Sequence, residues 1–168
     1  MLIWDSKMSE KFAVETLQKL KDPGLLLVGA KKNGKRNVMT IGWGFIGVMW
    51  RLKVFVVLVR PSRFTHEFVE DGGEFTVNVP DERMEKVVAH CGEVSGREHN
   101  KFKESKLHLV KGKKVRVPVI KECKIHYECR VIHKLKINPR LVSDKVKKRF
   151  YPKKNFHTVY FGEILAAY

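Results

Sequence analysis

Near the start of the chain, apolar residues first recur at the spacing of an amphipathic helix and then form the continuous runs that are typical of strands. Residues 9–20 carry them on one helical face, which predicts a short amphipathic helix with Ser9 as its N-cap. The segment Lys21-Asp22-Pro23-Gly24 ends this helix, because proline and glycine interrupt helical structure. Residues 24–30 then predict an apolar strand, and Asn33-Gly34 is typical of a hairpin turn.

The middle of the chain predicts further strands separated by a short helix. Residues 37–43 form the strand after the hairpin, and the β-branched run 54–59 is typical of a buried strand. A helix is predicted over 61–70 with Ser62 as its N-cap, and a strand follows over 74–79.

The second half of the chain adds one helix and three strands. The helix is predicted over 82–91, and a polar loop follows over 94–103. The strands are predicted over 115–119, 125–135 and 158–166. Between the last two lies a basic run, 145–154, which we expect to be mobile.

These elements predict a mostly β fold. Six or seven strands, joined mainly as hairpins and accompanied by few helices, indicate a closed antiparallel barrel with peripheral helices. A chain of 168 residues is most simply one domain with a core of ordinary size, so we expect a single domain over 1–168.

The charge balance is strongly basic and narrows the choice of partners. The chain has 34 Lys and Arg residues against 18 Asp and Glu, a net charge of +16. This indicates either a solvated lysine-rich surface together with an anionic cofactor, or a polyanion such as nucleic acid. Nucleic acid is the weaker alternative, because base stacking needs aromatic residues among the cations and only residues 147–156 come near that pattern.

Cysteine usage and apolar run lengths point to the cytoplasm. Three cysteines, an odd number without tight metal spacing, argue for a reducing compartment and against a disulfide framework. We expect no membrane partner, because no apolar run reaches the roughly 18–20 residues that span a bilayer. We expect no secretion signal, because the N-terminal residues show no basic region followed by a long apolar stretch.

The most informative stretch of the chain runs from Asn37 to Gly44, Asn-Val-Met-Thr-Ile-Gly-Trp-Gly. Gly42 and Gly44 permit a ligand to approach the main chain closely. Thr40 offers a hydroxyl, and the exposed amides offer hydrogen-bond donors. This composition suits a flat ring system that carries hydrogen-bonding groups.

A second candidate follows the buried strand at residues 59–66, Val-Arg-Pro-Ser-Arg-Phe-Thr-His. Ser62, Arg63 and Thr65 lie at a predicted helix N-terminus, where N–H groups and the helix dipole favour a phosphate. Arg60 or Arg63 would add charge-assisted contacts. The alternative is an ordinary serine cap flanked by surface arginines.

Two weaker candidates lie further along the chain. Ser95-Gly96 permits a tight turn with exposed amides, and Lys101 is within reach of a phosphate there, unless this is simply a charged surface loop. His157 precedes the last strand and either faces a ligand or is an ordinary solvated histidine. We expect no metal site, because the histidines and cysteines show no ligand spacing.

Taken together, these stretches resemble the flavin reductase-like family and, within it, flavoredoxin-type proteins. They occur in family order and cover most of the chain from Gly24 onward. The resemblance is carried by residues 37–43, 59–67, 75–80, 91–97 with Lys101-Phe102, and 157–164. The chain departs from the family near His99-Asn100, where an acidic residue is expected, and in its unusually basic segment 145–155.

The resemblance implies an FMN-binding split β-barrel that works as a homodimer, with the flavin near the subunit interface. The residues that would contact the ring and the ribityl chain are Asn37, Met39, Thr40, Ile41, Gly42 and Trp43. Those that would hold the phosphate end are Arg60, Ser62, Arg63 and Thr65. Ser95, Gly96 and Lys101 would close the site, and His157 would lie near a nicotinamide.

The implied activity is that of an FMN-dependent oxidoreductase. NADH or NADPH would supply a hydride, and electrons would leave to free flavin, oxygen or a redox protein. Because the flavin supplies the redox chemistry, no acid–base pair is needed. One alternative is a non-enzymatic electron carrier with tightly held FMN and no nicotinamide site. A remoter alternative is a basic nucleic-acid-binding barrel, which would be colourless and strongly salt-dependent.

Overall fold

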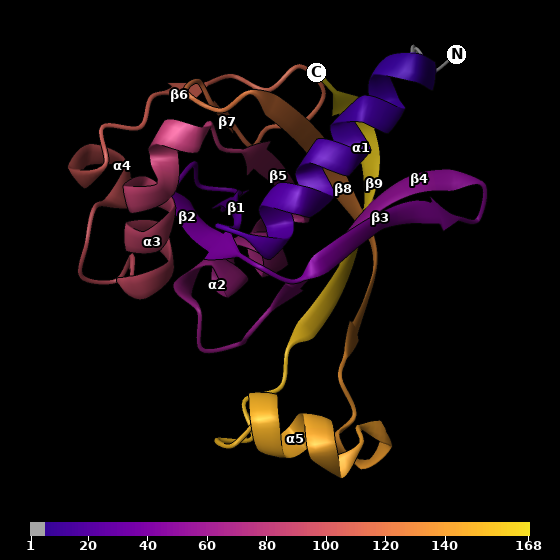
Figure 1. Ribbon diagram of the computed structural model, residues 1–168. Coiled ribbons are helices and arrows are strands. Elements are labelled where there is room, and N and C mark those ends of the chain that lie inside the picture. Colours follow the sequence, from indigo (N-terminus) through magenta and orange to yellow (C-terminus); the bar gives the residue numbers. More distant parts are fainter. Residues whose placement is uncertain (1–5) are drawn as a thin grey trace.

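The computed structural model describes residues 6–168, with side chains from Phe12 onward. Its centre is an antiparallel sheet of seven strands in the order β2-β1-β5-β8-β9-β4-β3, with helices around it (Figure 1). The strands are β1 (Leu25–Ala30), β2 (Arg36–Ile41), β3 (Gly44–Met49), β4 (Leu52–Val59), β5 (Glu74–Val79), β8 (Ile125–Lys136) and β9 (Thr158–Ala167). The prediction of a mostly β fold with peripheral helices is confirmed.

The remaining elements surround this sheet. A separate pair of short strands comprises β6 (Leu109–Val110) and β7 (Val119–Ile120). The helices are α1 (Ser6–Lys21), α2 (Phe64–Gly72), α3 (Glu85–Glu93), α4 (Lys101–Glu104) and α5 (Asp144–Phe150), and two 3-10 turns are η1 (Glu82–Met84) and η2 (Pro139–Leu141). Of the helices in this part of the chain, none has an apolar stretch long enough to cross a bilayer.

The strand pairings run from edge strand β2 to edge strand β3. Among residues 6–168 no ladder joins these two edges, so the closed barrel stays a prediction. The hairpin β1–β2 has the predicted turn, in which Gly34 has a φ of 84° and donates its N–H to the Lys31 carbonyl at 2.9 Å. The register of this hairpin places Met39 opposite Leu27 and Asn37 opposite Gly29. The stretch predicted to bind a ring thus begins on an edge strand.

Strand β1 is buried along its whole length because apolar layers cover both of its faces. Leu25 and Leu27 belong to a core cluster with Phe55, Phe75 and Tyr127. The alternating residues of β1 belong to a second cluster, beneath α3. This explains the unbroken apolar run in the sequence, since a strand covered on both faces shows no polar alternation.

Several predicted boundaries are wrong in the first half of the chain. Helix α1 already includes Ser6, the first described residue, so the helix does not begin at the predicted cap Ser9, whose side chain lies outside the described part. The strand predicted over 37–43 ends at Ile41, and the unpredicted β3 follows. Helix α2 begins at Phe64, so Arg63 and not Ser62 occupies the N-cap, with no side-chain cap bond.

The second half also departs from the predictions. Only the last residue of the strand predicted over 115–119 belongs to β7, and the buried residues before it are irregular. The loop predicted over 94–103 contains the start of α4. The basic run 145–154 forms most of α5 and the turn after it, where Tyr151 is buried, and its mobility stays a prediction.

Candidate functional site

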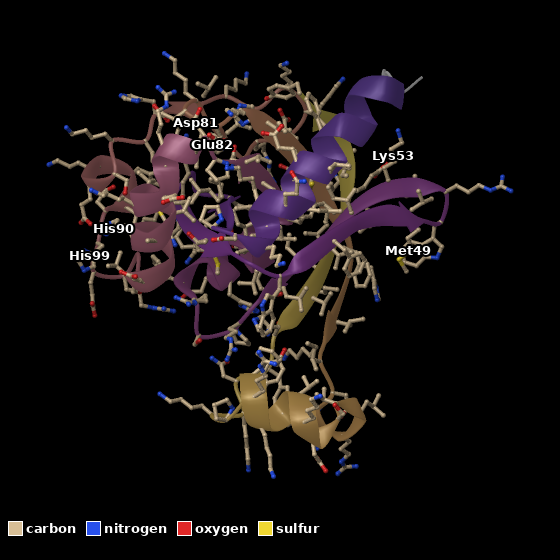
Figure 2. All side chains as sticks on the ribbon, in the orientation of Figure 1. Met49, Lys53, Asp81, Glu82, His90 and His99 are labelled. Atoms are coloured by element: carbon tan, nitrogen blue, oxygen red, sulfur yellow. The ribbon has the colours of Figure 1, made fainter. Side chains whose placement is uncertain are left out.

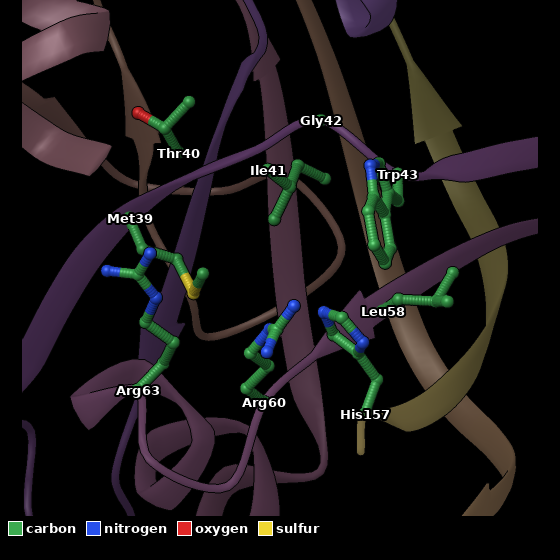
Figure 3. A pocket seen from close by; sticks show the side chains of 9 residues that line it. All are labelled: Met39, Thr40, Ile41, Gly42, Trp43, Leu58, Arg60, Arg63 and His157. Carbon is green, nitrogen blue, oxygen red and sulfur yellow. The ribbon is translucent and has the colours of Figure 1, made fainter. Parts of the chain in front are cut away.

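Two adjoining hollows lie where β2, the turn before α2 and the end of α3 meet. The first hollow, of about 160 Å³, is lined by Met39, Thr40, Ile41, Gly42, Trp43, Leu58, Arg60, Arg63 and His157 (Figure 3). The second hollow, of about 170 Å³, is lined by Asn37, Met39, Ser62, Arg63, Phe64, Thr65, Glu93, Val94, Ser95, Gly96 and Lys101. They share Met39 and Arg63, so the two hollows adjoin each other. All fourteen residues singled out from the sequence line one hollow or the other.

The main chain of residues 39–43 forms one wall of the first hollow. A Cβ atom added at Gly42 would meet only the Leu20 carbonyl oxygen, at 3.8 Å, so the backbone is open to a ligand there. Gly44 has a different role. A Cβ at that position would lie 2.5 Å from the Val56 carbonyl oxygen, so Gly44 permits the pairing of β3 with β4. Close approach to a ligand is therefore the property of Gly42 alone in this pair.

The side chain of Thr40 is turned away from the first hollow. Figure 3 shows its hydroxyl pointing away from Trp43 and Arg60. The hydroxyl donates to the Val88 carbonyl at 2.5 Å and so ties β2 to α3. The expectation that Thr40 offers its hydroxyl to a ring is not supported by this geometry. Its contribution to the hollow is its backbone.

An aromatic wall faces this backbone across the first hollow. The rings of Trp43 and His157 lie 4.9 Å apart, and Phe150 meets Trp43 edge-on at 5.2 Å. His157 Nδ1 is hydrogen-bonded to the Tyr151 hydroxyl at 2.8 Å. Burial, together with the nearby charges of Arg60 and Arg63, lowers the pKa of His157 to about 4. His157 is therefore neutral near pH 7 and acts by hydrogen bonding or contact, without a charge.

The two arginines of the site are partly occupied by backbone carbonyls. Arg60 donates from Nη2 to the Phe150 carbonyl at 2.9 Å and from Nη1 to the Asn155 carbonyl at 3.3 Å. Arg63 donates from Nη1 to the Gly92 carbonyl at 2.9 Å. A guanidinium has five N–H donors, so both retain donors for an anion. These carbonyl contacts also fix where each guanidinium lies.

The second hollow is built around a buried amide and a buried lysine. Asn37 Nδ2 donates to Thr65 Oγ1 at 2.8 Å, and both residues are buried. Lys101 is 3% exposed and its Nζ donates to the carbonyls of Cys91 at 3.0 Å and Val94 at 3.3 Å. Burial lowers the pKa of this ammonium group. In the described part of the chain it forms no ion pair, so an anion in the hollow would compensate a charge that only neutral carbonyls now contact.

The N-terminus of α2 completes the second hollow. Phe64 and Thr65, the first two residues of α2, both line it, so the helix start faces the space. First-turn N–H groups and the helix dipole favour an anion at such a place. Ser62 is not the cap that the sequence predicted, and its Oγ accepts a 2.6 Å hydrogen bond from Asn155 Nδ2. It still lines the hollow beside the helix start.

Sequence reasoning left four lining residues unassigned, Leu58, Phe64, Glu93 and Val94, and it missed two residues that support the site from outside the hollows. Tyr151 positions His157 through its hydroxyl. It lies within the basic run 145–154, where the many cations hid the significance of an aromatic residue. Arg97 donates to the Ser62 carbonyl at 3.2 Å and to Glu67 at 2.6 Å, and its guanidinium lies 4.7 Å from the centre of the Phe64 ring. The signal in the sequence that could have identified Arg97 is its position two residues after Ser95, a predicted site residue. Arg97 supports the turn that carries Ser62.

Comparisons with known proteins agree with this description. The family model described as flavin reductase like domain matches residues 23–168. A protein of Archaeoglobus fulgidus, named only as uncharacterized, is 35% identical over 131 residues, which are 78% of this chain and 64% of that one. This chain thus spans less than two thirds of that relative's length.

Two solved structures share the fold. A flavoredoxin from Methanosarcina acetivorans is 32% identical, with a TM-score of 0.67 over 86% of this chain and 67% of that one. An FMN-binding domain of a flavin reductase-like enzyme from Shewanella baltica is 18% identical, with a TM-score of 0.65 over 92% and 73% of the two chains. The second likeness concerns the fold alone. The match of the family model over most of the sequence shows that this chain belongs to the flavin reductase-like domain family.

Proposed function

We propose that this chain binds FMN across the two hollows and passes reducing equivalents from NADH or NADPH to free flavin or another acceptor. The observation that carries the proposal is the convergence of separate sequence stretches on two adjoining hollows. FMN has one planar ring and one phosphate. The first hollow offers an open backbone and an aromatic wall beside Arg60 and Arg63, and the second offers Arg63, Lys101 and the start of α2, with Glu93 as its one acid. Family membership supports the same assignment.

The residues present fit such a cofactor at both ends. At the ring end, the open backbone at Gly42 and the indole of Trp43 offer amide donors and an aromatic surface. At the phosphate end, Arg63, Lys101 and the start of α2 offer cationic and N–H groups. Bound FMN would supply the hydride and electron chemistry, and the protein would supply position and charge. Cations near the ring would favour its anionic reduced form.

We assign His157 a positioning role toward the nicotinamide. Its ring is neutral and is held by Tyr151 on the wall of the first hollow. A neutral imidazole offers a hydrogen bond to an uncharged amide without the cost of burying a second charge beside Arg60. Hydride transfer needs two rings in contact and no acid–base group.

A second candidate function is a non-enzymatic electron carrier with tightly held FMN. The likeness to a flavoredoxin favours it. The two functions differ in whether the purified protein oxidises NADH or NADPH through many turnovers. A nucleic-acid-binding barrel remains the remote alternative and predicts a colourless protein whose oligonucleotide affinity falls steeply with salt.

We further propose that two copies of the chain associate through β3 and α1. Edge strand β3 and the turn after it expose Phe45 at 50%, Val48 at 75% and Trp50 at 61%, and α1 exposes Val14 at 59% and Leu17 at 45%. Exposed apolar groups of this size on neighbouring elements are typical of an interface. Analytical ultracentrifugation tests this, and a monomer at micromolar concentration would contradict it.

The decisive test of FMN binding is the absorption spectrum of the purified protein after incubation with FMN and removal of the free cofactor. We expect a retained flavin spectrum that bleaches when NADPH is added without oxygen. Riboflavin, which lacks the phosphate, should bind at least tenfold more weakly, since a charge-assisted contact is worth about 1.5–3 kcal/mol. Equal affinities would contradict a phosphate in the second hollow.

A matched pair of variants tests the placement of the ring. Gly42→Val adds its side chain on the open wall, where the fold has room for a Cβ. Gly47 on β3 also has no atom within 4 Å of an added Cβ, and it lies outside both hollows. We expect Gly42→Val to lose FMN and Gly47→Val to retain it. Equal retention by the two variants would place the ring elsewhere.

A further inference from the structure

Residues 137–157 form an extension beside the first hollow, which we call the arm. It joins β8 to β9 and contains η2 and α5. Figure 1 shows it projecting from the sheet at the end opposite to β6 and β7. In Figure 2 the side chains of this segment spread outward, and many of them end in nitrogen.

The arm concentrates the positive charge of the chain. It has seven Lys or Arg residues and one acid, Asp144, a net charge of +6 out of +16 in 21 of the 168 residues. Six of the seven cations are exposed. Within the described part of the chain, the arm's one ion pair joins Lys147 to Asp144 at 2.7 Å. A surface that only needs solubility mixes both signs of charge, and this segment does not.

Apolar side chains stand among these cations. Leu141 is 84% exposed, Val146 is 37% exposed and Phe150 is 36% exposed. Protein–protein interfaces combine apolar anchors with a polar, charged rim, and lone solvated charge runs lack such anchors. The composition of the arm therefore indicates a protein partner that carries negative charge.

Direct contacts connect the arm to the first hollow. Arg60 holds the carbonyls of Phe150 and Asn155, and Asn155 binds the Ser62 hydroxyl. Phe150 also meets the indole of Trp43 edge-on. A protein docked on the arm would consequently lie at the edge of the space where we place the flavin ring.

We propose that the arm is the docking surface for an acidic protein that carries single electrons, and that it brings this carrier to the mouth of the first hollow. This inference rests on the proposed function. Each carrier takes one electron, so one reduced nicotinamide and two oxidised carriers yield one oxidised nicotinamide, two reduced carriers and one proton. The carrier is identified by its charge and by its redox centre.

Two other occupants of the arm are disfavoured by the same observations. A second copy that docked its own arm here would be repelled, because each arm carries a net charge of +6, and the dimer proposed above uses β3 and α1 instead. A single-stranded nucleic acid needs several exposed rings for its bases. On the arm, all of which the structure describes, Phe150 alone is an exposed ring, whereas Tyr151 is buried and stacks on Phe156 with ring centres 4.5 Å apart.

The test uses two haem carriers of opposite charge, the acidic soluble domain of cytochrome b5 and the basic cytochrome c. The FMN-loaded protein is reduced photochemically, so that no nicotinamide step is involved, and haem reduction is followed by stopped flow. Lys145, Lys148 and Lys153, all exposed on the arm, are changed together to Glu. The control variant changes Lys111, Lys114 and Lys121, exposed around β6 and β7, to Glu. Each triple substitution lowers the net charge of the chain from +16 to +10, so the two variants differ only in where the charge is changed.

We expect wild-type protein to reduce cytochrome b5 at least tenfold faster than the arm variant at low ionic strength, because electrostatic steering raises association rates by about 10–1,000-fold. The control variant should stay within about twofold of wild type, and the arm variant should gain rate with cytochrome c. Calorimetric binding of cytochrome b5 should weaken in the arm variant only and fall with salt.

Three results would overturn the inference. Equal losses in the two variants would show a general charge effect. Unchanged cytochrome b5 reduction in the arm variant would show that the arm is not the docking surface. Loss of oligonucleotide binding with unchanged carrier reduction would assign the arm to nucleic acid. A wild-type protein that retains no flavin is a separate failure, because it would contradict the proposed function before any carrier is added.

Discussion

The substitution Gly96→Ala tests whether the second hollow is as tightly built as its geometry indicates. Gly96 lies in the turn after α3, and a Cβ atom there would be 2.1 Å from Asn37 Oδ1 and 2.7 Å from Asn37 Cγ. Asn37 has little room to yield, because it is 5% exposed and its amide nitrogen donates to Thr65 Oγ1 at 2.8 Å. The added methyl group must therefore displace either this amide or the turn.

The expected cost follows from the hydrogen bond that would be lost. Leaving a buried donor or acceptor without a partner costs about 1–3 kcal/mol, so we expect Gly96→Ala to lower the free energy of unfolding by roughly 2 kcal/mol. For a chain of this size, that corresponds to a fall in Tm of roughly 4–8 °C. Because Asn37, Gly96 and Thr65 all line the second hollow, FMN affinity should fall as well.

Urea unfolding followed by circular dichroism measures this cost, with an unchanged m-value as the check that the same transition is observed. Gly47→Ala is the matched control, because its Cβ would meet no atom within 4 Å. Both substitutions restrict the unfolded chain equally, so that contribution cancels between them. If Gly96→Ala is as stable as Gly47→Ala, the tight contact between the turn and Asn37 is refuted.

Three further predictions concern charged and titrating groups. Burial alone would raise the pKa of the Glu128 carboxyl, but hydrogen bonds from the N–H groups of Lys113, Lys114 and Val115 and from the Tyr168 hydroxyl lower it on balance. The stability that this carboxylate contributes is therefore fully present above its ordinary pKa of 4.5 and is lost as the pH falls below it. In urea unfolding at pH 7, Glu128→Gln should lower the free energy of unfolding by roughly 2 kcal/mol. It should also make that free energy depend less on pH in the acid range, and an unchanged pH dependence there would contradict the argument. The pKa of His157 is lowered from 6.5 in the unfolded chain to about 4 in the folded protein. The unfolded chain therefore binds a proton before the folded protein does, and up to roughly 3 kcal/mol of stability is lost as the pH falls from 6.5 to 4. An NMR titration of the His157 ring with a midpoint near 6.5 would refute the burial argument. Arg60→Met removes the two hydrogen bonds to the carbonyls of Phe150 and Asn155, so trypsin should cut the arm at least several-fold faster than in wild type. The control Arg51→Met, at an exposed position in the β3–β4 turn, should leave the rate of cleavage unchanged.

Much of the sheet and of the site's lining could be predicted because the signals for them are local. The unbroken apolar run of β1 and the Asn33-Gly34 turn are each set by residues next to one another. The stretches around Thr40, Arg63 and Gly96 were singled out because glycines, hydroxyls and cations stand close together there in the sequence. The structure brings these stretches together, and the ligand that fills the space stays a proposal.

The elements that the sequence did not predict depend on partners far along the chain. Strand β3 exists because it pairs with β4, and its outward-facing Phe45 and Val48 hide the alternation that marks a strand with one buried face. Val115 and Val117 are buried and apolar like strand residues. Yet the N–H of Val115 goes to a carboxylate of Glu128 rather than to a neighbouring strand. The spacing of apolar residues in a sequence indicates which side chains are buried, but it does not indicate which groups accept the backbone hydrogen bonds.

Arg60 shows how the same kind of long-range contact links the site to the arm. Its position in the turn before α2 indicated an anion ligand, but two of its donors hold backbone carbonyls at the end of α5 and beyond it. Because a guanidinium is planar and rigid, fixing those donors also fixes the direction of the donors that face the first hollow. A partner that shifts the arm would therefore move the charge beside the proposed ring, and a ligand drawing on Arg60 would in turn loosen the arm. Coupling of this kind must be reciprocal, so carrier binding should change FMN affinity by the same factor by which FMN changes carrier affinity.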